Sequence, residues 1–389
     1  MPDYEAVDLT YICNAGLDVL GKQADAPIGP QMFHGLPFLV GSRAGNSERC
    51  FVARGDQFGR EPAIVPIERA ARHVIVAHRL LESDLAKGGL PGKLIASYVF
   101  HYADGSSVSV PIRERFEISI IPESIWTLPV LPFRAISDDK PRLYPRERGA
   151  WDEAGRRQEE IVRTPPRAYY LWTWTNPRPD LAIKAFEVVP QGPEFIIAAI
   201  TLGYVDEQPF LRTGRRELKI MLPQAEDAAK KFNIEVQVDR GLATYPYALP
   251  ESQEKFLGDA MKGWGEAQNS RSSPIYVEVA ATPSATLTVK QDEAVLGTAN
   301  WGEIENKGVV QPTPRLRIEL LDRGRNWVHT TVLDEDSSKP VPCRVHFRSP
   351  EGVPYQPHGH HNYVNSNHDT WNVDVGGDVR LGQITYGYI

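Results

Sequence analysis

Four of the ten histidines lie within eleven residues near the C-terminal end, at His358, His360, His361 and His368. Neutral imidazole is the commonest protein ligand of transition metals, and alternation along an extended segment places His358 and His360 on one side. Asp369 or Asp374 could add an oxygen ligand. The spacing matches no HExxH-type zinc signature, and the segment is rich in Gly, Pro and Asn, so a polar hydrogen-bonding loop is the alternative. The cluster predicts a site for a divalent transition metal, and with it a metal-dependent hydrolase.

A second group of candidates is aromatic. Trp172 and Trp174 alternate along one predicted strand and therefore share a face, and Asn176 follows two residues later. Exposed tryptophans on a β-sandwich can stack against sugar rings, with nearby polar groups orienting the ligand. The alternative is that these large rings fill the sandwich core. The ligand-binding hypothesis takes Trp172, Trp174 and Asn176 as contact residues.

Other catalytic signatures are missing from the sequence, so no catalytic residue is assigned. There is no GxSxG elbow, no Gly-rich phosphate loop and no CxxC pair. The cysteines, Cys13, Cys50 and Cys343, are too few and too scattered for a disulfide framework or a zinc knuckle. His73 and His78 lie five residues apart, on opposite faces of a predicted strand, and are interpreted as structural or surface residues.

Composition excludes several classes of protein. The 389 residues, with 41% hydrophobic and 24% charged residues, are typical of two or three domains with real cores. Thirty-two prolines block long helices and favour a turn-rich β chain. The net charge of −7 gives no reason to expect nucleic acid. No run of eighteen apolar residues predicts a membrane span, and no signal peptide is visible, so we expect a cytoplasmic protein.

The first 205 residues predict one β-sandwich of the jelly-roll type. Short apolar runs alternate with turns, and Asp104-Gly105 between two such runs predicts a hairpin. A proline-rich excursion at 122–166 interrupts the strands and carries at most one short helix near 151–161. Strands resume at 168–174, and Asn176-Pro177 ends the run sharply.

Residues 206–270 predict a mixed helix and strand connector, and 271–389 a second β-sandwich, truncated at its C-terminal end. Helices are expected at 223–232 and 250–264, with an alternating, half-buried strand at 234–239 between them and a linker at 269–273. Strands are expected at 275–280, 285–289, 315–321, 327–333 and 341–348. The predicted fold class is therefore mainly β.

Several segments together resemble galactose-binding-like jelly rolls: Phe33-His34-Gly35-Leu36-Pro37-Phe38, the strand ending at His78, the hairpin around Asp104-Gly105, and Trp174-Thr175-Asn176-Pro177. With Asp239-Arg240-Gly241-Leu242 and a second sandwich, the chain resembles the non-catalytic N-terminal region of bacterial CehA/McbA-type metallohydrolases, which carry a PHP domain further along. That catalytic domain would open with Asp-x-His-x-His. Here His358-Gly359-His360 follows Gln356-Pro357, so no catalytic residue of the PHP domain transfers to this sequence.

The resemblance implies an accessory module that binds carbohydrate or a catalytic partner domain. Because the chain ends inside a predicted strand, we expect either a fragment of a longer protein or a gene that kept only the accessory modules. The alternative is the metal-dependent hydrolase with the histidine cluster as its site. A third hypothesis has the two sandwiches orienting a missing catalytic domain or packing as a homo-oligomer. Neither nucleic acid nor membrane is an expected partner, and the oligomeric state stays open.

Overall fold

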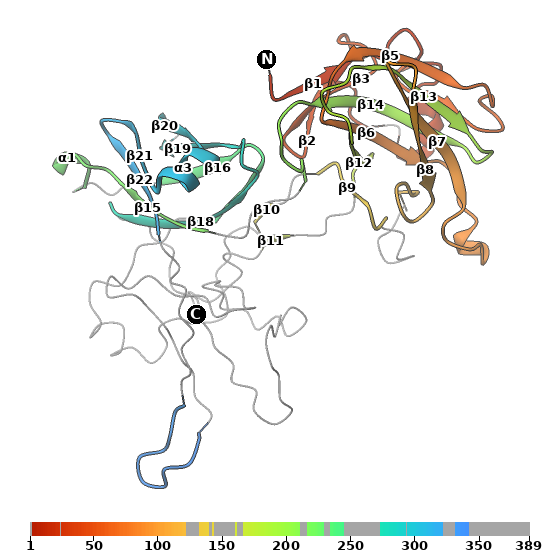
Figure 1. Cartoon of the computed structure of the whole chain (residues 1–389). Helices are drawn as coiled ribbons and strands as arrows, with labels where there is room; N and C mark the ends of the chain where they lie inside the picture. Colours follow the sequence, from red (N-terminus) through yellow and green to blue (C-terminus); the bar gives the residue numbers. More distant parts are fainter. Residues whose placement is uncertain are drawn as a thin grey trace. The chain divides into compact units, whose positions relative to one another are not determined.

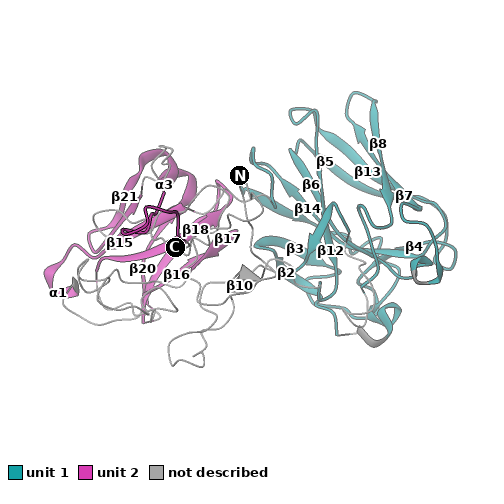
Figure 2. Cartoon of the chain, turned by 90° about the horizontal axis from the view of Figure 1, so that it is seen from below, with its two compact units in different colours: residues 1–141, 163–211 teal, residues 142–162, 212–389 magenta. Residues whose placement is uncertain are grey.

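The computed structural model describes residues 2–23, 25–121, 132–139, 142–143, 160–161, 166–210, 216–228, 234–244, 273–292, 294–321 and 331–341. The predicted mainly β class is confirmed. Two compact units divide the chain, one of residues 1–141 with 163–211 and one of 142–162 with 212–389 (Figure 2). Within the described part of the chain, no helix has the length and apolar character needed to cross a membrane.

A six-stranded antiparallel sheet forms the middle of the first unit (Figure 1). Its strands run in the order β1 (Tyr4–Val7), β14 (Phe195–Gly203), β6 (His73–Leu80), β12 (Tyr170–Thr175) and β9 (Ala135–Ser137), and β4 (Val52–Arg54) also pairs with β14. Every residue of β6 and β14 is buried. Continuous burial of this kind means that both faces of the sheet are covered.

A four-stranded sheet covers one of these faces. Its order is β5 (Ala63–Arg69), β13 (Ile183–Pro190), β7 (Leu94–Tyr102) and β8 (Ser107–Arg113). Its inward side chains, among them Tyr98, Phe100 and Phe186, join Trp172 and Trp174 in one core cluster. The hairpin predicted at Asp104-Gly105 connects β7 to β8. Gly105 has a φ of 86°, which an L side chain adopts only at a cost.

The hairpin of β2 (Gly29–Phe33) and β3 (Leu36–Val40) packs with the other face of the six-stranded sheet. The short helix η1 (Leu17–Gln23) adds to this layer, and a second short helix, η2 (Leu85–Lys87), lies between β6 and β7. The second core cluster of the unit includes Phe33, Leu36 and Phe38 from the hairpin with Ile75 and Leu171 from the sheet. The first unit is therefore a layered β-sandwich.

The second unit has its own core between two sheets and a helix. One sheet has the order β17 (Gly241–Ala243), β18 (Ile275–Ala281), β15 (Arg216–Met221), β22 (Leu316–Leu320) and β21 (Val309–Thr313). The other has the order β16 (Ile234–Val238), β19 (Thr286–Gln291) and β20 (Ala294–Asn300). Helix α3 (Trp301–Lys307) begins after Asn300, whose side chain accepts a hydrogen bond from the Glu303 amide, and it buries Trp301 and Ile304.

Two expectations, on the connector and on the boundary between the units, are revised, and two expected helices are described only in part or not at all. The connector at 206–270 is not separate in its described part, because β15 pairs with β18 and β22, and β17 pairs with β18. The division between units lies at residue 211 rather than 205. Of the expected helix at 223–232, α1 (Ala225–Ala228) is described, and the expected helix at 250–264 lies outside the described residues.

The remaining expectations concern individual strands and one short helix. The strand at 234–239 is confirmed as β16, with alternating burial. In the proline-rich excursion, β10 (Arg142–Leu143) pairs with β11 (Glu160–Ile161), and the expected helix near 151–161 otherwise lies outside the described residues. The strands expected at 327–333 and 341–348 fall mostly outside the described residues, and β20, α3 and β21 were not predicted. The jelly-roll topology stays a prediction.

Candidate functional site

The two tryptophans expected to contact a ligand lie in the core of the first unit. Trp172 is 5% exposed and Trp174 is 8% exposed. The Trp174 ring stacks on Phe100 with centroids 3.6 Å apart and planes 6° apart, and Trp172 packs edge-on against Tyr98 at 5.8 Å. A sugar ring would have to displace Phe100 to reach Trp174. The alternative interpretation, that these rings fill the sandwich, fits their placement.

Asn176, the third expected contact residue, is 4% exposed and fully engaged within the protein. Its Oδ1 accepts hydrogen bonds from the Tyr102 hydroxyl at 2.6 Å and the Arg178 amide at 2.9 Å. Its Nδ2 donates to the carbonyl oxygens of Ala71 at 2.8 Å and Arg178 at 3.0 Å. Four hydrogen bonds use the whole capacity of a side-chain amide, so Asn176 fixes the turn after β12.

The histidine cluster at His358, His360, His361 and His368 lies outside the described residues. The metal site and the hydrolase that it predicts therefore stay predictions. Within the described ranges, no group of three or more His, Cys, Asp or Glu side chains is arranged to hold a metal ion.

Two histidines of strand β6 are buried, and one is held in a defined protonation state. The Nε2 of His78 lies 2.9 Å from the backbone carbonyl of Glu117, which can only accept, so this nitrogen carries the proton. Nδ1 then accepts from the Tyr98 hydroxyl at 2.9 Å. Burial lowers the pKa of His78 to about 4 and also lowers that of His73. Neutral, enclosed imidazoles of this kind serve packing.

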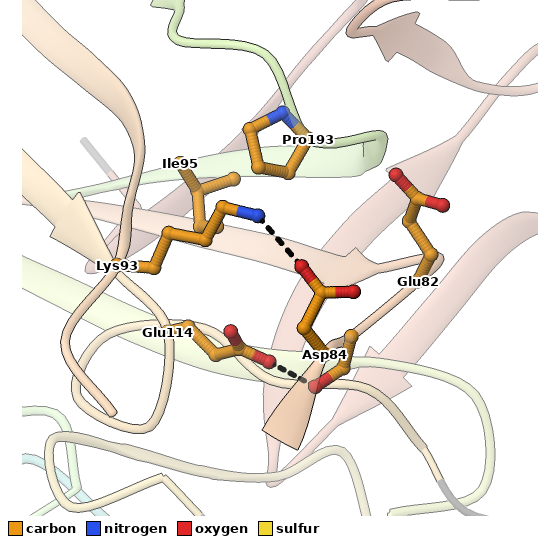
Figure 3. Close-up of a pocket in the computed structure, with 7 residues that line it drawn as sticks. Glu82, Asp84, Lys93, Ile95, Glu114 and Pro193 are labelled. Carbon is orange, nitrogen blue, oxygen red and sulfur yellow. Dashed lines mark hydrogen bonds and ion pairs between the residues drawn. The ribbon is translucent and has the colours of Figure 1, made fainter. Parts of the chain in front are cut away.

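A shallow surface pocket lies at the end of the first unit where β6 leaves the sheet (Figure 3). Its acids are Glu82, Asp84 and Glu114, and Lys93 Nζ lies 3.0 Å from Asp84 Oδ2. The Ser83 hydroxyl donates to Glu114. Hydrogen bonding between Lys93 and Asp84 lowers the pKa of the acid and raises that of the amine. Lys93 therefore stays protonated and is no nucleophile at neutral pH.

The outer side of the four-stranded sheet offers a larger surface, which we call the open face (Figure 1). Residues on this side alternate with the core residues, and strand register places them on three neighbouring rungs. The central residues are partly exposed and those of the edge strands are exposed. The open face consists of Ile64, Pro66, Ser97, Val99, His101, Ser107, Ser109, Pro111, Ala185, Glu187 and Val189.

The open face carries almost no charge. Its only ionisable members, His101 and Glu187, pair with each other, with Nε2 and Oε2 2.7 Å apart. Ile64 adds an exposed aliphatic side chain, since it is 55% exposed. Lys184, in the bulge of β13, and Arg113, at the end of β8, border the face. Such a surface can dock against another protein with little desolvation of charge.

Proline occurs in both edge strands of this sheet, at Pro66 in β5 and Pro111 in β8. A proline lacks the N–H that an incoming strand would pair with, so it protects an edge against strand addition. The sheet is therefore suited to contacts through its face rather than along its edges.

Sequence reasoning gave the open face no role, although one signal was visible. The segment Leu94–Tyr102 alternates two kinds of side chain: Ser97, Val99 and His101 on one face, and the large aromatic residues Tyr98 and Phe100 on the other. This alternation predicts that only the aromatic face is filled with large rings. The rest of the surface depends on strand register. Comparisons of the chain with protein-family models, with curated proteins and with solved structures found no match in any of the three.

Proposed function

We propose that this chain is a non-catalytic binding module that docks a partner domain through the open face of the four-stranded sheet. The observation that carries the proposal is the composition of that face, in which the only ionisable residues among eleven from four strands are His101 and Glu187, which pair with each other. An ordinary solvated sheet face alternates apolar inward residues with polar outward ones. Here the outward set includes Ile64, Val99 and Val189.

The size of the open face supports a role as the centre of an interface. Three rungs about 7 Å apart on four strands about 4.8 Å apart cover roughly 400 Å². A standard interface buries roughly 800 Å² on each partner. The neighbouring loops would therefore supply the rim, where polar and charged groups such as Lys184 and Arg113 are usual.

The partner would be a metallohydrolase catalytic domain, as the resemblance to CehA/McbA-type proteins suggests. Carbohydrate is the competing ligand, since Ser97, Ser107 and Ser109 offer hydroxyl groups on the same face. Protein is favoured because the aromatic rings that stack on sugars, Trp172 and Trp174, are in the core.

A charge placed at the middle of the open face tests the proposal. Val99→Lys should weaken binding of a separately purified PHP catalytic domain of a CehA/McbA-type metallohydrolase at least about tenfold, because the long charged side chain, even opposite Glu187, would have to be desolvated at the middle of the interface. Met32→Lys is the matched control, since Met32 is 65% exposed on β2 in the layer beyond the six-stranded sheet. The measurement is calorimetric titration of each variant.

Three results would contradict the proposal. They are no binding of the catalytic domain, equal weakening by both substitutions, and binding of a glycan on an array that Val99→Lys abolishes. A dimer in sedimentation velocity that Val99→Lys dissociates would assign the open face to a second copy of the chain instead.

A further inference from the structure

A cluster of arginines and phenylalanines follows strand β8, outside the open face. We call it the Arg–Phe patch and define it as Arg113, Arg115, Phe116, Phe133 and Arg134. Two backbone hydrogen bonds join its halves, from the Phe133 amide to the Arg115 carbonyl at 3.0 Å and from the Arg134 amide to the Phe116 carbonyl at 2.8 Å. The two phenylalanine rings lie 5.6 Å apart and are tilted by 56°.

The guanidinium groups are held in place over the rings. Arg113 Cζ lies 4.6 Å from the centroid of Phe116, and Arg115 Cζ lies 5.2 Å from that of Phe133. Arg115 has a φ of 68°, a left-handed conformation that a non-glycine residue keeps only where the surroundings fix it. Cation–π contacts of this kind orient arginine side chains without neutralising them.

A buried carboxylate organises two of the arginines. Glu117 is 1% exposed and accepts from Arg113 Nη2 at 2.9 Å, from Arg113 Nε at 3.2 Å and from Arg134 Nη1 at 3.3 Å. One carboxylate therefore serves two guanidinium groups. Glu114, the other acid of this turn, points to Ser83 in the pocket of Figure 3.

The outer part of the patch faces solvent. Phe133 is 71% exposed, and the Arg134 side chain is 66% exposed. An exposed aromatic ring among preorganised arginines matches the residue types that are enriched in protein interfaces. The positive surplus of the patch contrasts with the net charge of −7 of the whole chain.

We infer that the Arg–Phe patch docks an acidic segment of a partner protein that also carries an aromatic or large apolar side chain. A carboxylate of that segment would pair with the guanidinium group of Arg134, and the apolar side chain would pack on Phe133. Single-stranded nucleic acid fits less well, because the tilted rings form no parallel platform for successive bases. This inference does not depend on the function of the open face.

Fluorescence anisotropy of the full chain with labelled short peptides tests the inference. A polyglutamate peptide with one tryptophan should bind, and binding should weaken as salt rises from about 50 to about 300 mM. Phe133→Ala and Arg134→Gln should each weaken binding about threefold or more. The matched controls are Met32→Ala and Arg60→Gln, since Met32 is 65% exposed and the Arg60 side chain 70% exposed elsewhere on the first unit.

The inference is overturned if the polyglutamate peptide binds no better than a polylysine peptide with one tryptophan, or if patch and control variants behave alike. Preferred binding of a single-stranded oligothymidine would also overturn it. Val99→Lys should leave peptide binding unchanged, so that failure of the patch and failure of the open face can be told apart.

Discussion

His78 and Asn176 are polar residues inside the core of the first unit, and each has its hydrogen-bonding groups satisfied by the protein. Removing such a side chain leaves its buried hydrogen-bond partners unsatisfied, which costs about 1–3 kcal/mol per group. A residue in this position therefore contributes to the fold rather than to ligand contact. Asn176 was predicted to contact a ligand because of its side-chain amide. Its hydrogen bonds within the protein explain why it fixes the turn after β12 instead.

The protonation of His78 gives a pH dependence of stability. Its pKa is about 4 in the folded protein against 6.5 in an unfolded chain, so only the unfolded state takes up a proton between these values. Stability is therefore retained above pH 6.5 and falls as the pH drops toward 4, by about 2 kcal/mol at pH 5. We expect His78→Gln to remove this pH-dependent loss of stability.

The measurement is the free energy of unfolding in urea at pH 7.5 and pH 5 for the native chain and His78→Gln. The native chain should lose about 2 kcal/mol more than the variant between the two pH values. An equal loss in both proteins would show that His78 is not held neutral in the folded state. His101→Gln serves as the control, because His101 is on the open face and 40% exposed.

Individual strands were predictable where the signal is local. The Asp104-Gly105 turn fixes the β7–β8 hairpin, and the alternation of Ile234, Val236 and Val238 defines β16. Alternation also placed Trp172 and Trp174 on one face, but the sequence of a single strand does not show whether another strand covers that face. Its cover, Phe100, comes from a strand more than seventy residues earlier in the chain.

Two glycine-to-alanine substitutions in turns are expected to cost different amounts of stability. Gly105 has a φ of 86° and open space around it, so Gly105→Ala should cost only about 1 kcal/mol, from the backbone alone. Gly55 has a φ of 125°, and a Cβ there would lie 2.7 Å from Glu194 Cα. Gly55→Ala should therefore cost about 3 kcal/mol or more. Urea unfolding of both variants checks the order, and equal costs would contradict the close approach.

At the level of the whole molecule, both proposed binding surfaces are assembled from distant parts of the sequence. The open face draws on four strands between Ala63 and Pro190, and the Arg–Phe patch joins the turn after β8 to residues 133–134. Neither has a linear motif. The assignment of β15 to the second unit has the same origin, since its partners β18 and β22 follow about sixty and one hundred residues later.

Chemical labelling of a thiol on the open face tests the central claim most directly. Burial raises the pKa of Cys13 to about 11 and that of Cys50 to about 12, so both native thiols should react slowly, and a Cys343→Ser background removes the third. Ser109→Cys would then report on the open face, and Met32→Cys on a surface elsewhere. The maleimide reaction rate is measured with and without the PHP catalytic domain.

If the open face docks the catalytic domain, that domain should slow labelling at Ser109→Cys at least about tenfold and leave Met32→Cys unchanged, because partner residues at the centre of an interface exclude water and reagent alike. Unchanged labelling at Ser109→Cys under conditions that saturate binding, or equal protection at the two positions, would contradict docking through the open face.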